Sequence, residues 1–328
     1  MAAWRGETIE NLGLGMVAAC DARGVLLASA GDCDRPVFLR SAGKPIQALP
    51  LVLSGAAEAF GFGDAEIALA CGSHAGSARH LEVLARMLAK AGLREEHLRC
   101  GIHPPVDPGE RERLRTAGEA PSRRHGNCSG KHAGFLATAR HGGYDLESYL
   151  DPGHPVQRGV LEALAALAGM DQAAIALATD GCGAPTFALP LRAVARSFAA
   201  FADPPSAPSG LAPGLTRIGR AMAAEPWCVG GDGHFETELM RATHGRIIIK
   251  PGAEGVLALA AGGIGLAIKL EAGVSGEPLH AVTVDALEQL ELLGGSELEA
   301  VARWRRPSIR NLAGTVTGRL EPLLRLRP

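Results

Sequence analysis

A serine and a lysine stand three residues apart in the segment Arg40-Ser41-Ala42-Gly43-Lys44-Pro45. At the start of a helix, positions i and i+3 lie on one face, so the Ser41 hydroxyl and the Lys44 amine can come within hydrogen-bond reach. A serine becomes a strong nucleophile when a base accepts its proton, and a lysine can do so only if burial or a cationic neighbour keeps it neutral. The alternative is a helix N-cap followed by a solvated lysine.

A second serine and a second lysine could form a similar pair. Ser73 lies among small residues in the segment Cys71-Gly72-Ser73-His74-Ala75-Gly76, and Lys250 directly follows the apolar run Ile247-Ile248-Ile249. The S-x-x-K spacing at Ser41 is typical of serine β-lactamases, and a lysine followed closely by glycine on an edge strand is another of their elements. Ser73 could therefore relay a proton or orient a substrate with Lys250 as its basic partner, although the segment also suits a glycine-rich turn.

Two further clusters combine glycine with polar side chains. The segment from Gly126 to Gly134 precedes an apolar helix, so its backbone N–H groups could bind an anion. It lacks the G-x-x-x-x-G-K-[ST] spacing of a phosphate loop, which excludes nucleotide binding of that kind. The segment Thr179 to Pro185 ends a short apolar run, and Asp180 there could bind an α-amino group or cap the turn.

These two clusters also contain Cys128 and Cys182. Buried cysteines are more often structural than ligating, and a zinc site needs three or four ligands. The nearest third candidate is Lys131, which must lose its proton to bind a metal. The residue types alone therefore leave a zinc site and two structural thiols as open alternatives.

Hydrophobic periodicity predicts strands near both ends of the chain and helices between them. We expect a hairpin over 15–28 and a helix from 46 to 57 that Pro50 should kink. The remaining expected helices span 78–91, 155–168, 191–201 and 280–293, and the remaining strands span 175–178, 246–249, 256–260 and 266–270. We therefore predict an α/β fold of the α+β type, in which an antiparallel sheet from N- and C-terminal strands is flanked by helices, with a central mainly helical region.

Composition narrows the functional classes. The net charge of −2 and the aromatic content of 4% argue against a nucleic-acid partner. The longest apolar stretch, 256–268, is too short to span a bilayer, and the N-terminal segment does not resemble a signal peptide. Seven cysteines at irregular spacing do not suggest a disulfide framework, so we expect a cytoplasmic protein without a membrane partner.

Five segments in this order resemble the class 3 L-asparaginases, the asparaginase II family. They are 40–47, 72–76, 127–135, 180–185 and 250–255, and the resemblance extends from about Glu10 to Leu270. One departure is Ser77, where the family more often carries glutamate. The resemblance implies a single domain over residues 1–328, with two lobes sharing one cleft and a fold similar to serine β-lactamases and glutaminases.

The resemblance also implies a function and a set of site residues. It implies a homodimer that hydrolyses L-asparagine to L-aspartate and ammonia without an organic cofactor. Its nucleophile would be Ser41 with Lys44 as base, and Ser73 with Lys250 would form the second couple. Substrate-binding positions would be Arg40, Asn127, His132 and Asp180, and a zinc ion would be held by Cys128, Lys131 and Cys182.

Two alternatives to an asparaginase stay open from the sequence. One is a glutaminase or β-lactamase-like serine hydrolase, and the other is a non-catalytic amino-acid-binding protein on the same scaffold. Intact Ser41, Lys44, Ser73 and Lys250 favour an enzyme. If zinc is bound, two thiolates already neutralise its charge, so we expect it to fix the pocket or substrate rather than to act as a strong Lewis acid.

Overall fold

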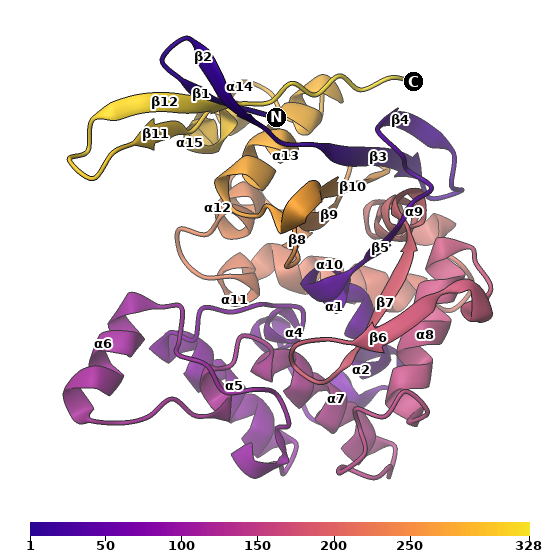
Figure 1. Cartoon of the computed structure of the whole chain (residues 1–328). Coiled ribbons are helices and arrows are strands. Elements are labelled where there is room, and N and C mark those ends of the chain that lie inside the picture. Colours follow the sequence, from indigo (N-terminus) through magenta and orange to yellow (C-terminus); the bar gives the residue numbers. More distant parts are fainter.

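A five-stranded antiparallel sheet joins the two ends of the chain in the computed structural model, which describes all residues 1–328. The strand order is β4-β3-β10-β9-β8 (Figure 1). The strands are β3 (Gly15–Asp21), β4 (Leu26–Ala30), β8 (Ile247–Pro251), β9 (Val256–Ala261) and β10 (Ile264–Leu270). Residues of β9 are buried on both faces, which explains its continuous apolar sequence. The prediction of one sheet built from distant parts of the chain is confirmed.

Two smaller sheets complete the strand content. The first has the order β11-β12-β1-β2 and brings the N-terminal strands beside the C-terminal ones, and the second has the order β5-β7-β6. Their strands are β1 (Ala2–Arg5), β2 (Thr8–Leu12), β5 (Pro36–Phe38), β6 (Ala176–Thr179), β7 (Pro185–Pro190), β11 (Ser308–Arg310) and β12 (Val316–Glu321). Of these strands only β6 was expected from the sequence pattern, because several of the others are short and largely exposed.

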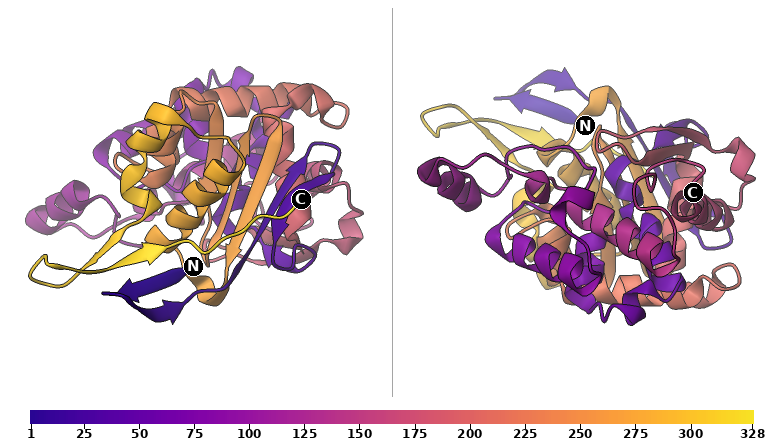
Figure 2. Two further views of the ribbon diagram at one scale, coloured as in Figure 1. Left: turned by 90° about the horizontal axis from the view of Figure 1, so that it is seen from above. Right: turned by 90° about the horizontal axis from the view of Figure 1, so that it is seen from below.

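Helices cover the large sheet and form a region of their own. Helix α9 (Leu191–Ala202) packs against β3, β9 and β10, and the helices between residues 44 and 168 gather at the other side of the molecule (Figures 1 and 2). The other helices are α1 (Lys44–Gln47), α2 (Leu49–Leu53), α3 (Ala56–Ala59), α4 (Asp64–Ala70), α5 (Ala78–Lys90), α6 (Pro108–Ala117), α7 (Ser129–His141), α8 (Pro155–Ala168), α10 (Ala212–Ala224), α11 (Pro226–Val229), α12 (Phe235–Ala242), α13 (Glu277–Gln289), α14 (Gly295–Ala300) and α15 (Ala302–Arg305). The expected central helical region is therefore present. None of these helices combines the length and the apolar composition that a bilayer crossing requires.

Most expected elements lie where the sequence placed them, with two corrections. The helix expected over 46–57 is broken into α1, α2 and α3, because Pro45 and Pro50 lie in the first turns of α1 and α2, and Gly55, with a left-handed backbone (φ 80°), separates α2 from α3. The strand expected over 175–178 forms as β6, but most of its residues are exposed rather than buried. It pairs with β7 alone, so it lies at the edge of its small sheet.

Candidate functional site

The short turn Arg40–Gly43, which carries Ser41, lies against the backbone at the end of β8. Arg40 has a left-handed backbone (φ 47°), which is uncommon for a residue other than glycine and often marks a functional site. A Cβ at Gly252 would lie 2.9 Å from the Leu39 carbonyl oxygen and 3.0 Å from the Ala42 nitrogen. Gly252 therefore allows the backbone just beyond Lys250 to lie directly against the turn that carries Ser41.

The Lys44 ammonium group is buried and donates three hydrogen bonds. Its Nζ lies 2.7 Å from the Gly72 carbonyl oxygen, 2.9 Å from the Ser73 Oγ and 3.2 Å from the Asn127 carbonyl oxygen. Three is the full donor capacity of a charged lysine. The side chain of Lys44 therefore joins three of the segments that the sequence singled out.

The observed pairing differs from the pairing expected from the sequence. Lys44 is hydrogen-bonded to Ser73, whereas the Ser41 hydroxyl has no hydrogen bond to another protein group. The two backbone carbonyls near Ser73 provide strong acceptors, and they draw the Lys44 side chain inward. The expected hydrogen bond between Ser73 and Lys250 is also absent, since Lys250 Nζ donates to the Pro251 carbonyl oxygen at 2.7 Å.

Lys250 lies in a strongly perturbed environment. The residue is fully buried at the end of β8. Burial, followed by repulsion from the charge of Lys44, lowers the pKa of Lys250 to about 7, although the carboxylate of Glu236 acts in the opposite direction. A lysine with such a pKa is partly neutral at neutral pH and can accept a proton, a property that clusters at functional sites.

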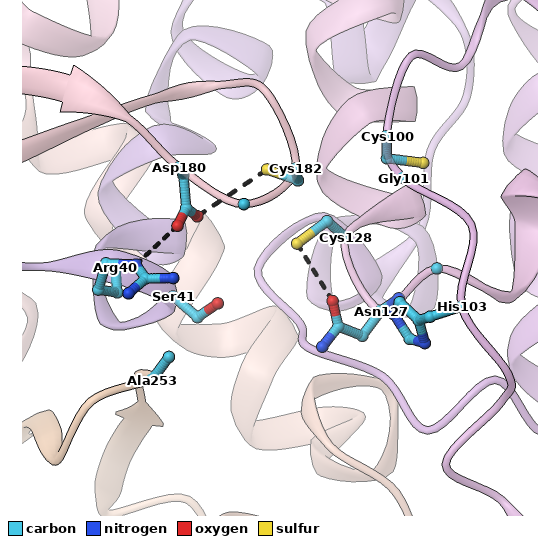
Figure 3. A pocket seen from close by; sticks show the side chains of 12 residues that line it. Arg40, Ser41, Cys100, Gly101, His103, Asn127, Cys128, Asp180, Cys182 and Ala253 are labelled. Carbon is cyan, nitrogen blue, oxygen red and sulfur yellow. Dashed lines mark hydrogen bonds and ion pairs between the residues drawn. The ribbon is translucent and has the colours of Figure 1, made fainter. Parts of the chain in front are cut away.

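Ser41 opens onto a cavity of about 200 Å³ (Figure 3). This volume is smaller than the usual 300 Å³ or more of sites for drug-sized ligands, so it suits a molecule the size of an amino acid. The residues that line the cavity are Arg40, Ser41, Cys100, Gly101, His103, Gly126, Asn127, Cys128, Asp180, Gly181, Cys182 and Ala253. Four sequence clusters that are far apart in the chain therefore converge on one small space.

A cation and an anion lie side by side in this cavity. Arg40 Nε donates to Asp180 Oδ1 at 2.6 Å, and the Asp180 side chain is only 9% exposed (Figure 3). Burial is the largest single effect on Asp180 and would raise its pKa, but the hydrogen bond from Arg40, the charge of Lys131 and the Gly181 backbone N–H together lower the pKa below its ordinary value. Asp180 is therefore a carboxylate at neutral pH, and the pair offers both charges that a zwitterionic amino acid needs.

The thiols of Cys128 and Cys182 lie close enough to perturb one another. Contact with Cys182, helped by the ammonium groups of Lys44 and Lys131, lowers the pKa of Cys128 well below its ordinary value. Contact with Cys128 and burial raise the pKa of Cys182. Lys131 Nζ donates to the Cys182 Sγ at 3.2 Å, so the three side chains named from the sequence form one buried cluster.

The donor chemistry of this cluster fits a thiophilic metal, with one condition. Thiolates suit zinc, and the low pKa of Cys128 provides one. No group of three or more His, Cys, Asp or Glu side chains in the chain is arranged to hold a metal. A zinc site here therefore requires the Lys131 amine as a third ligand, with the metal in place of a proton.

One wall of the cavity was not foreseen from the sequence. His103 Nδ1 lies 2.8 Å from the Pro104 carbonyl oxygen, and the Asn127 backbone N–H donates to His103 Nε2 at 3.0 Å. These contacts fix the ring with its hydrogen on Nδ1 and attach the wall to Asn127. Cys100 and Gly101 belong to the same wall, which has neither periodicity nor a motif that could have marked it.

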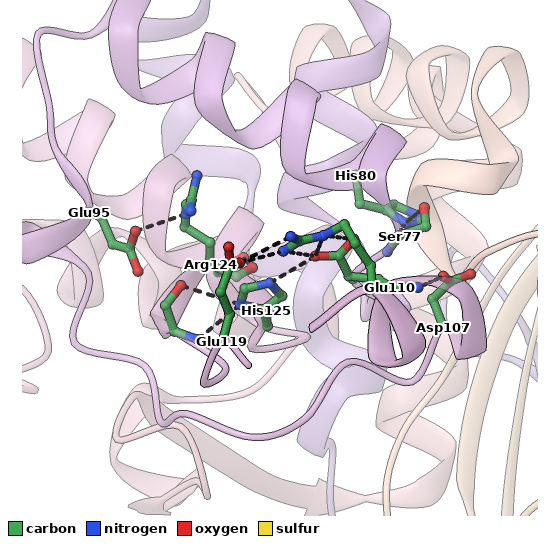
Figure 4. Close-up of polar contacts among 12 residues, drawn as sticks. Ser77, His80, Glu95, Asp107, Glu110, Glu119, Arg124 and His125 are labelled. Carbon is green, nitrogen blue, oxygen red and sulfur yellow. Dashed lines mark hydrogen bonds and ion pairs between the residues drawn. The ribbon is translucent and has the colours of Figure 1, made fainter. Parts of the chain in front are cut away.

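A buried contact between His125 and Glu110 supports the segment that leads into this wall (Figure 4). His125 Nε2 lies 3.3 Å from Glu110 Oε1, with both side chains 3% exposed. Ser122 donates its backbone N–H to His125 Nδ1, and Asp107 caps the helix α6 that carries Glu110. Helix α6 is thus fastened to the segment that leads into Asn127.

His132 does not line the cavity, unlike the other expected substrate-binding residues. It is fully buried on α7, and its Nδ1 lies 2.6 Å from the Tyr149 hydroxyl. The Arg99 backbone N–H donates to that same hydroxyl, so Tyr149 joins His132 to the Arg99 backbone. His132 therefore supports the α7 segment from behind rather than facing the space beside Ser41.

Comparison with known proteins gives one near-complete match. The family model described as L-asparaginase II matches residues 1–322. No curated protein sequence matches the chain. Among solved structures, the chain is similar to Mglu at 15% identity and a TM-score of 0.40, with 85% of this chain and 67% of Mglu covered.

Two further structures of Mglu give similar values. Its native form matches at 16% identity and a TM-score of 0.40, covering 87% of this chain and 66% of that one. Its tris and glutamate form matches at 16% identity and a TM-score of 0.39, covering 85% of this chain and 59% of that one. The chain thus spans about two thirds or less of these distant proteins. The family match, in contrast, covers nearly the whole chain and makes it an amide hydrolase: the chain belongs to the L-asparaginase II family.

Proposed function

We propose that this protein hydrolyses L-asparagine to L-aspartate and ammonia, with Ser41 as the nucleophile. The observation that carries the proposal is the position of the Ser41 hydroxyl in a small cavity beside the Arg40–Asp180 pair. Arg40 would bind the substrate α-carboxylate and Asp180 the α-ammonium group. This arrangement would hold the side-chain amide of a short amino acid near Ser41.

The proton transfers would use the two lysines in different ways. In the first step, the Ser41 Oγ attacks the amide carbon, and its proton passes to a base. Lys44 already donates three hydrogen bonds, so it would have to give up one of its protons before it could accept another. We therefore assign the resting base to Lys250, with Lys44 and Ser73 relaying the proton. The last transfer would require Lys250 Nζ to turn from the Pro251 carbonyl oxygen towards Ser73.

The remaining steps follow the chemistry of an acyl-enzyme. Protonation of the leaving nitrogen releases ammonia and leaves an ester between Ser41 and the aspartyl group. A water molecule then attacks this ester, the same base accepts the water proton, and Ser41 recovers its hydroxyl hydrogen as L-aspartate leaves.

Ammonia release from L-asparagine tests the nucleophile directly. The variant Ser41→Ala should lose about 10⁴-fold or more in kcat while it keeps the wild-type circular dichroism spectrum. Ser54→Ala, which removes an exposed serine, is the matched control and should keep full activity. Full activity in Ser41→Ala would refute the mechanism.

A substrate panel tests the specificity. L-glutamine and penicillin belong in this panel because a glutaminase or a β-lactamase-like hydrolase would use the same serine. The proposal requires a higher kcat/KM for L-asparagine than for either. A clear preference for glutamine or penicillin would replace L-asparagine as the assigned substrate.

We also propose that Cys128, Lys131 and Cys182 can hold zinc, as the family resemblance implies. When bound, the metal would fix the cavity wall or orient the substrate, because two thiolates neutralise its charge. Protein purified without added metal should contain about one zinc per chain by elemental analysis, and Cys182→Ser should remove most of it. Metal-free protein with freely titratable Cys128 and Cys182 would refute the site. The homodimer implied by the resemblance can be checked by light scattering.

A further inference from the structure

Glu236 is a buried carboxylate next to the reaction centre that no sequence motif marks. It is the second residue of α12 and is 7% exposed. Its closest cationic partner is His234, whose Nδ1 lies 3.8 Å from Glu236 Oε1. A carboxylate with such a distant partner is costly to bury unless other positive charge lies nearby.

The backbone beside Glu236 belongs to the Ser73 segment. A Cβ at Gly230 would lie 2.4 Å from Glu236 Oε1, so the carboxylate rests directly on the Gly230 backbone. The Gly230 carbonyl accepts the Ala75 N–H at 2.8 Å, and the Val229 carbonyl accepts the Ser73 N–H at 2.7 Å. Glu236 therefore packs on the strip of backbone that fixes Ser73.

Helix α12, which carries Glu236, packs against β8, which carries the positively charged side chain of Lys250. Lys250 and Lys44 are both fully buried. Asp180, the carboxylate of the cavity, is already bonded to Arg40. Lys250 has no salt bridge within 4 Å, and Glu236 is the carboxylate whose charge acts on it across the contact between α12 and β8.

We propose that Glu236 is a positioning residue of the reaction centre: its carboxylate is the counter-ion of Lys250 and thereby controls the proton available to the Lys44–Ser73 pair. The inference rests on the proposed amide hydrolysis. Lys250 is faced by Lys44, Cys71, Cys128 and Glu236. Glu236 is faced by Lys250 and His234, and His280 lies on the adjoining helix within its field.

The charge balance gives the sign of the expected effect. Glu236 raises the pKa of Lys250, while burial and Lys44 lower it. Removing the carboxylate charge therefore makes Lys250 easier to deprotonate. One opposite charge that acts without direct contact corresponds to a shift on the order of one pH unit.

The pH profile of kcat/KM for L-asparagine tests the proposal in the full-length protein. In Glu236→Gln, the acid limb should move about one unit to lower pH, whereas Glu236→Asp should keep it near the wild-type position. Glu66→Gln is the matched control, because Glu66 is equally buried but bonds to Lys90 at 2.9 Å. It should leave the limb in place. An unshifted limb in Glu236→Gln, even with a uniformly lower rate, would assign Glu236 a merely structural role and overturn the proposal.

A second measurement separates this inference from the proposed function. The free energy of unfolding should rise with pH once Lys250 becomes neutral in the folded state. This rise should begin about one pH unit lower in Glu236→Gln than in the wild type, whether or not the enzyme acts on L-asparagine. Identical pH dependence of stability in the two proteins would overturn the inference, whereas inactivity of the wild type on every amide would overturn only the proposed function.

Discussion

Replacing Lys250 by methionine should stabilise the fold while it removes the proposed activity. Methionine keeps most of the volume of the lysine side chain and removes its charge. Lys250 is fully buried, and its pKa is lowered to about 7 by burial and by the charge of Lys44. In the unfolded chain the same side chain titrates near a pKa of about 10.4. The folded state therefore disfavours the charged form.

The two pKa values give the size and sign of the effect. Well below pH 7 both states carry the proton, so the full cost of the buried charge, about 5 kcal/mol, is present, and about 4 kcal/mol of it is left at pH 7. Between pH 7 and about 10.4 the unfolded state holds more protons, so stability rises with pH. Loss of the hydrogen bond to the Pro251 carbonyl costs about 1 kcal/mol. Lys250→Met should therefore gain about 3 kcal/mol at pH 7 and almost nothing at pH 9.5.

Urea denaturation at these two pH values measures the difference. The comparison of variant with wild type at each pH cancels the titration of other groups. Lys269→Met is a suitable control, because Lys269 is only partly buried, and it should change stability by no more than about 0.5 kcal/mol at either pH. An equal or lower stability of Lys250→Met at pH 7, or a gain that persists at pH 9.5, would refute the reasoning about the buried ammonium.

Two other substitutions test the geometry of the site. Gly72→Ala would place a Cβ 2.4 Å from the Cys228 carbonyl oxygen and 3.1 Å from that of Val229. It should lower the free energy of unfolding by about 1–3 kcal/mol in urea denaturation and reduce kcat by displacing Ser73, whereas unchanged stability would contradict the close approach. Asp180→Asn leaves the Arg40 guanidinium without its anionic partner. The KM for L-asparagine should rise about 10- to 100-fold in steady-state assays, and an unchanged KM would exclude Asp180 from substrate binding.

The sequence was sufficient to predict many side chains of the site, but not which hydrogen bonds those side chains make. Ser41, Lys44 and Ser73 lie in segments rich in small residues, and such segments mark places where backbones approach closely. Their partners depend on tertiary packing. Lys44 bonds to Ser73 because two carbonyls from separate segments surround its ammonium group, and no local spacing encodes that arrangement.

Single residues outside motifs could not be found in this way. His103 belongs to an irregular loop, and Glu236 lies among ordinary helix residues. Each gains its role only when a distant segment is placed beside it, Asn127 in one case and Gly230 in the other. The elements with strong periodicity were predicted well: the helix expected over 78–91 forms as α5 and the one over 155–168 as α8. The small sheet β11-β12-β1-β2 escaped prediction because its strands are short and at least partly exposed.

The pairing of β3 with β10 has a consequence for synthesis and folding. Residues Gly15–Asp21 meet Ile264–Leu270 in the finished sheet, so the partner of β3 leaves the ribosome only after some 250 residues have been made. Until then β3 has no β10 edge to pair with, and Lys250, which precedes that strand, is also missing from the reaction centre. We therefore expect slow folding with high contact order. A ribosome-bound chain that stops before β8 should expose an aggregation-prone strand edge and cannot assemble both lysines beside Ser73.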